Sequence, residues 1–262
     1  MLEVTNLRKV FGDFVAVDDV TFSLPERGSL AVVGESGSGK TTTARMIAGL
    51  EAPSGGQIVV AGSGRPSGRV RPNVRRVRSR QIQMVFQDPY SSLDRRQRVY
   101  DAVAEAVMLH RPLPKDALHA RVSELLDMVG LDDRQARSLP KALSGGQRQR
   151  VAIARALAAE PRVLILDEAI AALDVSIQAQ ILSLLARIRT NTGTTLLFIT
   201  HDLSAVRHVS EEVLVMRAGK VVEHGPIAAV LDHPQDPYTR RLIDSIPKPG
   251  WKPRRRTQST DT

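Results

Sequence analysis

The sequence predicts an α/β fold whose central sheet is mostly parallel. Three short apolar runs have the length and composition of fully buried parallel strands, and they lie at residues 29–34, 162–168 and 194–202. Between the last two, residues 175–190 place their apolar side chains on one face of a helix. A strand, a helix and a second strand at this spacing are typical of a parallel crossover unit, which indicates an α/β core.

The other elements are predicted from their own local patterns. Residues 20–24 alternate apolar and polar side chains, as a half-buried strand does. Residues 57–62 and 81–86 are also strand-like, whereas 98–129 has a helical pattern. Residues 212–225 are predicted to form a hairpin.

This order of elements predicts one large domain over residues 1–246, with an insertion. The core would consist of 1–88 and 158–235, and a helical subdomain at 89–157 would be inserted between these two parts. Residues 248–262 have the composition of a disordered basic tail.

The composition excludes several kinds of site. The 262 residues include no cysteine, which excludes disulfides, thiolate zinc sites, cysteine-ligated iron–sulfur clusters and thiol catalysis. No apolar run approaches the roughly 18 residues that a membrane span needs, and the N-terminus has no signal-peptide pattern. The absence of cysteine also fits a protein of a reducing compartment.

The net charge of +9 suggests nucleic acid or an anionic membrane surface as a partner, but the placement of the charge weakens that suggestion. Residues 57–87 hold seven arginines and no acidic residue, and residues 248–262 carry a net charge of +4. The rest of the chain is left with a formal charge of −2. We therefore expect two basic appendages on a body that is not basic, and no specific binding of nucleic acid.

Residues 34–41 read GESGSGKT and fulfil the phosphate-loop pattern G-x-x-x-x-G-K-[ST] in full. The pattern follows a buried strand and precedes a helix, as it must. Its backbone N–H groups are expected to face phosphate oxygens, with Lys40 reaching the β- and γ-phosphates and the Thr41 hydroxyl ligating Mg²⁺. The sequence thus predicts a P-loop NTPase (RecA-like) core, and the nucleotide-binding residues are Gly34, Glu35, Ser36, Gly37, Ser38, Gly39, Lys40, Thr41 and Thr42.

Polar residues end the next two buried strands at the same edge of the predicted sheet. Asp167 is expected to hold the Mg²⁺ shell, and Glu168 to orient and deprotonate the attacking water. His201 is expected to contact the γ-phosphate. Solvated acids and a structural histidine are the alternative, but all three residues lie where ligands bind in open α/β sheets.

A second glycine-rich turn opens onto a helix at residues 142–150, which read ALSGGQRQR. The phosphate loop already serves one phosphate tail, so the chain carries two predicted anion sites for one nucleotide.

Taken together, these motifs resemble those of the ATP-binding cassette (ABC) ATPases that drive ABC transporters. The phosphate loop, Gln87, the LSGGQ segment, the two acids, Asp174 and His201 occur in the order of that family, over about residues 2–246. The resemblance implies the family fold, in which an antiparallel β subdomain and an inserted helical subdomain flank the core, and it implies ATP and Mg²⁺ as ligands.

The resemblance also implies roles that the residues alone do not give. Two cassettes would pair head to tail, so that Ser144, Gly145, Gly146 and Gln147 bind the ATP held by the partner's phosphate loop. Phe11 would stack on adenine, Asp174 would link the two sites, and Gln87 would join the metal site and couple hydrolysis to a membrane partner.

Residues 82–94, 172–182 and 233–247 are similar to the ATPase subunits of peptide and nickel importers, and the last stretch is a C-terminal extension typical of that subfamily. Three departures are present. Ala169 and Ala171 replace a usual proline and serine without removing a catalytic group. Asp94-Arg95 replaces Asn-Pro near the surface that meets membrane subunits in the family, and a chain without cysteine cannot hold the iron–sulfur cluster that some members carry.

The sequence therefore predicts an ATPase subunit that powers the import of peptides or a related solute. Its expected partners are a second ATPase subunit, as a homodimer or heterodimer, two membrane-spanning permease subunits and an extracytoplasmic solute-binding protein. We expect it at the cytoplasmic face of the membrane, as a peripheral protein.

Two other functions use the same motifs. A non-transport ABC ATPase that acts on DNA or ribosomes would fit the net charge, but such chains usually carry two cassettes or a long coiled-coil insertion. A regulatory nucleotide-binding module without turnover would not need Glu168 and His201.

Overall fold

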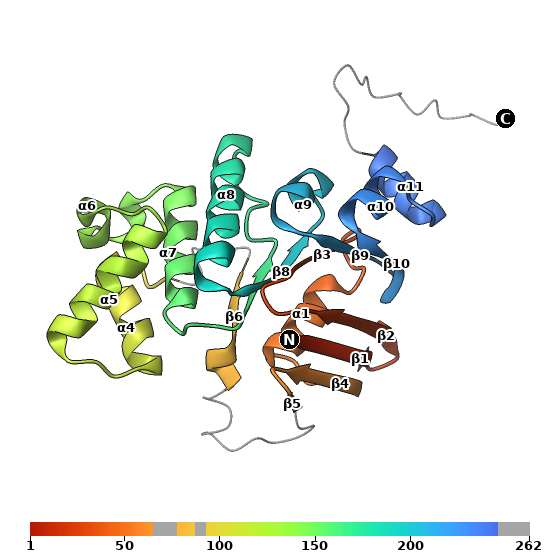
Figure 1. The fold of residues 1–262 in the computed structure, drawn as a ribbon, viewed down its shortest axis with the longest axis horizontal. Helices are drawn as coiled ribbons and strands as arrows, with labels where there is room; N and C mark the ends of the chain where they lie inside the picture. The colour runs from red at the N-terminus through yellow and green to blue at the C-terminus, as the bar shows by residue number, and fades with distance from the viewer. Residues whose placement is uncertain (65–77, 87–92, 246–262) are drawn as a thin grey trace.

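The computed structural model describes residues 1–64, 78–86 and 93–245. Its centre is a six-stranded sheet in the order β10-β9-β3-β8-β7-β6 (Figure 1). All strands but β10 run parallel, and β10 pairs antiparallel with β9. The predicted, mostly parallel α/β core is therefore confirmed. Its strands are β3 (Ser29–Val33), β6 (Ile82–Val85), β7 (Val163–Asp167), β8 (Thr195–Thr200), β9 (Glu212–Arg217) and β10 (Lys220–Pro226).

A second sheet is antiparallel throughout and has the order β2-β1-β4-β5. Its apolar side chains share a buried cluster with helix α1 (Lys40–Ala48) and with one face of the central sheet, where Ile165 and Ile199 project. The antiparallel sheet and α1 thus cover that face together. The strands of the second sheet are β1 (Leu2–Phe11), β2 (Phe14–Leu24), β4 (Gly55–Val60) and β5 (Ser63–Gly64).

The opposite face of the central sheet is covered by helices. Because successive side chains of a strand point to opposite faces, Leu164 and Leu166 leave β7 on the side away from Ile165. They join a cluster with α7 (Gly145–Leu157) and α8 (Val175–Thr192), the helix predicted at 175–190. Toward β9, a third cluster packs β3 and β9 against α9 (Leu203–Val209), α10 (Ile227–Asp232) and α11 (Pro237–Asp244).

The helices of the predicted insertion lie together at one end of the molecule (Figure 1). They are α4 (Val99–His110), α5 (Lys115–Met128), α6 (Asp133–Arg137), the 3₁₀ turn Pro140–Ala142, and α7. Asp132 and Ser144 each form a capping box at the start of the helix that follows, so both N-termini are fixed by local sequence. The domain boundaries drawn around these helices stay a prediction.

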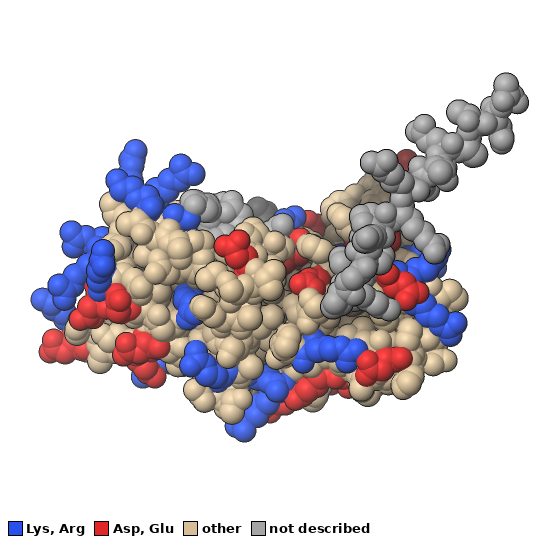
Figure 2. Space-filling view, turned by 90° about the horizontal axis from the view of Figure 1, so that it is seen from above, with Lys and Arg blue, Asp and Glu red and all other residues tan. Residues whose placement is uncertain are grey.

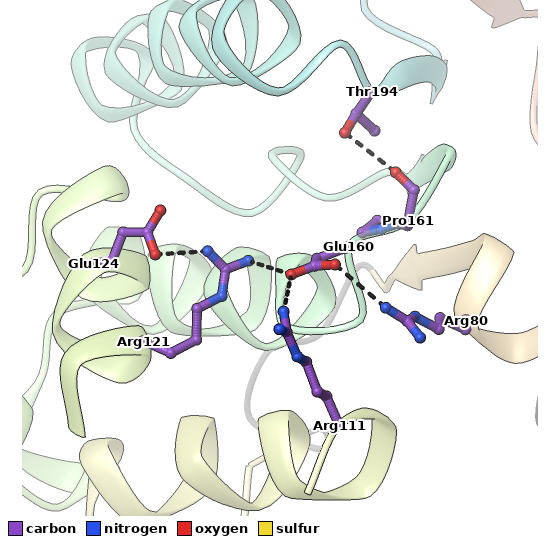
Figure 3. Close-up of polar contacts among 7 residues, drawn as sticks. All are labelled: Arg80, Arg111, Arg121, Glu124, Glu160, Pro161 and Thr194. Carbon is purple, nitrogen blue, oxygen red and sulfur yellow. Dashed lines mark hydrogen bonds and ion pairs between the residues drawn. The ribbon is translucent and has the colours of Figure 1, made fainter. Parts of the chain in front are cut away.

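Glu160 joins this helical end to the central sheet (Figure 3). It lies between α7 and β7, and its carboxylate contacts Arg80 at 3.3 Å, Arg121 at 3.4 Å and Arg111 at 3.7 Å. These arginines come from the segment before β6, from α5 and from the end of α4. One carboxylate therefore holds three separate segments, and the next residue, Pro161, accepts a hydrogen bond from Thr194 at 3.2 Å.

The predicted hairpin at 212–225 is formed by β9 and β10. Its turn residues Ala218 and Gly219 have φ of 46° and 82°, as a tight hairpin turn requires. Among the described residues, no helix is both long enough and apolar enough to cross a membrane.

Charged side chains of both signs are interspersed over the face shown in Figure 2. Most of the basic segment at 65–80 and all of the tail at 248–262 lie outside the described residues. Arg78 and Arg80 are described, and each contacts the folded body, Arg78 through the carbonyl of Gly64.

Candidate nucleotide site

The phosphate loop joins β3 to α1 in a conformation that depends on glycine. Gly34 and Gly39 have φ of 150° and 101°. A Cβ atom on Gly34 would stand 2.2 Å from the carbonyl oxygen of Met216, and one on Gly39 would stand 2.6 Å from that of Ala16. Glycine is thus required at both positions by the close approach of neighbouring backbone.

Lys40 begins α1 and is buried beneath the loop. Its ammonium donates to the carbonyls of Gly34 at 2.7 Å and Glu35 at 2.8 Å. Burial lowers the pKa of Lys40, and the carboxylates of Glu168, Asp167 and Glu35 oppose that shift. The loop therefore encloses a desolvated ammonium group. The negative charge of a bound phosphate would stabilise that group in its charged form.

Asp167 ends β7 and meets Thr41, which lies in the first turn of α1. The Thr41 hydroxyl donates to the Asp167 carboxylate at 3.0 Å. Burial raises the pKa of Asp167, while the hydrogen bond from Thr41 acts in the opposite direction. The carboxylate is thus only partly compensated by its protein neighbours.

These two side chains fit a magnesium ion. Mg²⁺ prefers oxygen ligands and is usually held by one or two protein oxygens together with phosphates and water. The Thr41 hydroxyl and the Asp167 carboxylate are two such oxygens. Over 1–64, 78–86 and 93–245 no group of three or more His, Cys, Asp or Glu could hold a metal by itself. Gln87, the third predicted metal residue, lies outside the described residues.

Glu168 and His201 follow neighbouring strands and face each other. Nδ1 of His201 lies 3.6 Å from Oε1 of Glu168. Glu168 has φ of 49°, which is rare for a residue with a side chain, and its N–H donates to the carbonyl of Ile199 at 2.9 Å. Glu168 thus leaves the line of β7 at this turn. Its side chain is 21% exposed, and that of His201 is 59% exposed.

The LSGGQ turn stands at the N-terminus of α7. The Ser144 hydroxyl accepts from the N–H of Gln147 at 3.3 Å, and the Gln147 side chain accepts from the N–H of Ser144 at 2.9 Å. Ser144 is exposed, whereas Gly146 is buried against α8. A Cβ atom on Gly146 would stand 2.5 Å from Ile177, so glycine is needed here for the packing of α7 on α8 within one chain.

The structure brings only some of the predicted site residues together. Lys40, Thr41, Asp167, Glu168 and His201 meet at the carboxyl edge of the central sheet. In the described part of the chain, no hydrogen bond or ion pair links Ser144, Gly145, Gly146, Gln147 or Asp174 to the phosphate loop.

Phe11 lies at the end of β1 with 47% of its surface exposed. The ammonium of Lys9 stands 4.7 Å from the centroid of its ring, a cation–π contact. An exposed aromatic ring at a strand end is available for stacking, as the resemblance implies for adenine. Phe14, at the start of β2, is 64% exposed and was not predicted as a site residue.

Tyr238 is a residue of the site that the sequence did not reveal. It lies in α11, and its hydroxyl accepts a hydrogen bond from the N–H of Glu35 in the phosphate loop at 3.0 Å. The only signal in the sequence was that 233–247 resembles a subfamily extension, which gives no contact with the loop.

The profile of the protein family described as "ABC transporter" matches residues 17–171. The chain belongs to the ABC transporter family. Its nucleotide is therefore ATP, and the resemblance inferred from the motifs is confirmed.

Curated relatives are similar over most of this chain. It is 46% identical over 243 residues to the oligopeptide transport ATP-binding protein OppD of Mycobacterium tuberculosis, which covers 93% of this chain and 39% of the relative. It is 45% identical over 241 residues to the glutathione import ATP-binding protein GsiA of Escherichia coli, covering 92% of this chain and 38% of the relative. The chain thus spans about two-fifths of the length of these ABC proteins.

Solved structures share the fold. The chain matches cbiO1 of Clostridium perfringens, part of the ABC transporter complex cbiONQ, with a TM-score of 0.80 and 31% identity, over 88% of this chain and 90% of that one. It matches the dimeric structure of MJ0796, a bacterial ABC transporter cassette, with a TM-score of 0.76 and 27% identity, over 87% of this chain and 99% of that one. The predicted P-loop NTPase fold is confirmed by these matches.

Proposed function

We propose that this chain is the ATP-hydrolysing subunit of an ABC importer for peptides or a related solute. The observation that supports this most strongly is the convergence of Lys40, Thr41, Asp167, Glu168 and His201 at one edge of the sheet. These residues supply a cation, a pair of metal ligands and a base at one place. The names of OppD and GsiA support a peptide or glutathione as the class of solute.

In the proposed site, the phosphate loop binds the triphosphate and Lys40 turns its ammonium from the carbonyls of Gly34 and Glu35 toward the β- and γ-phosphates. Thr41 and Asp167, which lie within hydrogen-bond distance of each other, would hold the metal ion. Mg²⁺, when bound, neutralises charge that develops on the transferred phosphoryl group. These groups position the phosphates and stabilise their charge, which is most of what catalysis of phosphoryl transfer needs.

Glu168 is the proposed general base. Its Oε1 would take a proton from the water that attacks the γ-phosphorus, and general-base catalysis of this kind is worth about 10²–10⁴ in rate. His201, whose Nδ1 is 3.6 Å from that oxygen, would contact the γ-phosphate. The left-handed backbone at Glu168 supports this assignment, since backbone outliers persist where the surrounding structure fixes them and they cluster at functional sites.

The LSGGQ turn is proposed to bind the ATP of a second cassette. Ser144 is exposed at the N-terminus of α7, where backbone N–H groups and the helix dipole favour an anion. No described contact links this turn to the chain's own phosphate loop, and the dimeric cassette MJ0796 has the same fold. Asp174, exposed at the start of α8, would link the two nucleotide sites.

The partners of the importer follow from the same proposal. They are a second cassette, two membrane-spanning permease subunits and an extracytoplasmic solute-binding protein, with this chain at the cytoplasmic face. The test is co-purification with the permease subunits, reconstitution, and ATPase measurement with the binding protein and di- or oligopeptides. We expect turnover that requires Mg²⁺ and rises with peptide. Hydrolysis that neither peptides nor glutathione stimulate would contradict the proposed solute class. A complete absence of hydrolysis would contradict the proposal that this chain is an ATPase.

A further inference from the structure

Two C-terminal elements hold the phosphate loop from outside it. The N–H of Gly219, in the β9–β10 turn, donates to the carbonyl of Ser38 at 3.0 Å. The hydroxyl of Tyr238, in α11, accepts from the N–H of Glu35 at 3.0 Å. Gly219 lies within the ATPase core, but Tyr238 lies in the C-terminal extension, 203 positions from its partner. The extension therefore reaches the nucleotide site itself.

Tyr238 is fixed before it meets the loop. It is 5% exposed and belongs to the buried cluster that includes Val33 of β3 and Val215 of β9. The guanidinium of Arg217 stands 5.1 Å from the centroid of its ring. Burial and close packing restrict the motion of the ring, which favours a fixed position of its hydroxyl beside the loop.

The start of α11 is fixed as well. The Asp236 carboxylate caps the helix by accepting from the N–H groups of Tyr238 and Thr239. The Glu223 carboxylate, in β10, accepts from the N–H groups of Gln235 and Asp236. The extension is thus anchored to the central sheet directly before the tyrosine.

The loop needs such an anchor because its sequence is rich in glycine. Gly34 and Gly37 flank Glu35 and have φ of 150° and 80°, so this backbone has more freedom to lose than an ordinary loop. The carbonyl of Glu35 accepts from Lys40 at 2.8 Å and from the N–H of Ser38 at 3.2 Å. In the proposed function Lys40 turns to the phosphates, so Glu35 is then held by the Ser38 N–H at its carbonyl and by the Tyr238 hydroxyl at its N–H.

We propose that Tyr238 is a positioning residue for ATP: its hydroxyl keeps the first turn of the phosphate loop in the nucleotide-binding conformation through the Glu35 N–H. This inference rests on the proposed nucleotide site. Without the hydroxyl, the free loop samples more conformations, and the cost of ordering it is added to nucleotide binding. The loss falls on binding rather than on the chemical step, because Tyr238 touches none of the reacting groups.

Tyr238→Phe tests this directly, since it removes the hydroxyl and keeps the ring in its buried cluster and beside Arg217. The matched control is Tyr100→Phe, which removes a hydroxyl that contacts Nδ1 of His119 at 3.2 Å in the helical end. The affinity for Mg-ADP and for a non-hydrolysable ATP analogue is measured by calorimetry on the full chain. Melting of the nucleotide-free chain and steady-state ATPase rates are recorded alongside.

We expect the Kd of Tyr238→Phe to rise by about three- to tenfold, with KM rising in step and kcat close to wild type. Tyr100→Phe should keep the wild-type Kd. An unchanged Kd in Tyr238→Phe, with or without a lower melting temperature, would overturn the inference, because the hydroxyl would then serve only the packing of the extension. Absence of nucleotide binding by the wild-type chain would instead overturn the proposed function, and this inference with it.

Discussion

The hydroxyl of Thr41, at the start of α1, donates to the carboxylate of Asp167, at the end of β7, over 3.0 Å and 126 positions of sequence. This contact joins the two motifs on which the nucleotide site depends. Asp167 is buried there, and burial raises the pKa of its carboxyl although the hydrogen bond from Thr41 acts in the opposite direction. The ionised carboxylate of Asp167 therefore lowers the stability of the nucleotide-free chain, whereas it favours the binding of Mg-ATP.

Asp167→Asn should stabilise the nucleotide-free chain at neutral pH and weaken its stabilisation by Mg-ATP. Because the pKa of Asp167 is raised in the native chain, ionisation of this carboxyl lowers the free energy of unfolding. Stability is therefore lost as the pH rises from the ordinary carboxyl pKa through the raised native pKa. The gain in melting temperature should thus grow from acid to neutral pH. A gain in melting temperature that does not grow between acid and neutral pH would contradict the account.

Lys40→Ala should lower ATP affinity and reduce hydrolysis by at least about 100-fold, because it removes the cation aimed at the phosphates. The exposed Lys115→Ala, at the start of α5, is the matched control and should hydrolyse normally. Nucleotide titration and phosphate release are the measurements. Near wild-type turnover in Lys40→Ala would show that residues 34–41 are not the phosphate loop.

Ser144→Asp tests whether the LSGGQ turn acts on the partner's ATP. Aspartate caps a helix as well as serine does, so the fold should persist while its charge repels a γ-phosphate. Gly146 is a poorer choice, since any side chain there meets Ile177 of its own chain. Ser144→Asp should bind ATP normally and lose turnover.

Mixing Ser144→Asp with Lys40→Ala gives pairs in which one site carries both changes and the other carries neither. In a self-pairing chain, turnover should then exceed the sum of the two variants measured alone. No recovery, together with no ATP-dependent crosslink between position 144 and the partner's phosphate loop, would contradict the trans arrangement.

Glu160→Gln should lower the free energy of unfolding by about 1 kcal/mol at low salt and by less at high salt, because half-exposed ion pairs are screened. Glu124→Gln, which removes one contact with Arg121, is the control and should cost less. Urea unfolding at two salt concentrations decides this. An equal effect in both variants would mean that Glu160 does not join the helical end to the sheet.

The sheet and the phosphate loop could be predicted because their signals are local. Apolar runs such as 162–168 have the length and composition of a fully buried strand. Residues 34–41 combine the fixed spacing of the phosphate-loop motif with a preceding strand and a following helix. The meeting of Asp167, Glu168 and His201 followed from one rule, that parallel strands end at the same edge. These predictions needed no long-range contact to be known.

The rest depends on packing between distant segments. The buried position of Gly146 is set by Ile177 on another helix, and the contact of Tyr238 with Glu35 is set by how α11 folds back on the sheet. The sequence predicts that Arg80 belongs to a solvated basic run. In the structure it contacts Glu160, which lies beyond the inserted helices in the sequence. No periodicity or motif records such contacts.

Glu168→Gln tests the central claim, that this chain hydrolyses ATP with Glu168 as the base. The amide keeps the shape of the side chain and its hydrogen bonding but cannot accept the proton from water. ATP binding should be retained, turnover should fall by about 10²–10⁴, and the ATP-bound cassette pair should persist longer in size-exclusion chromatography. Exposed Glu26→Gln should behave as wild type. A Glu168→Gln chain that hydrolyses Mg-ATP at the wild-type rate would contradict the account.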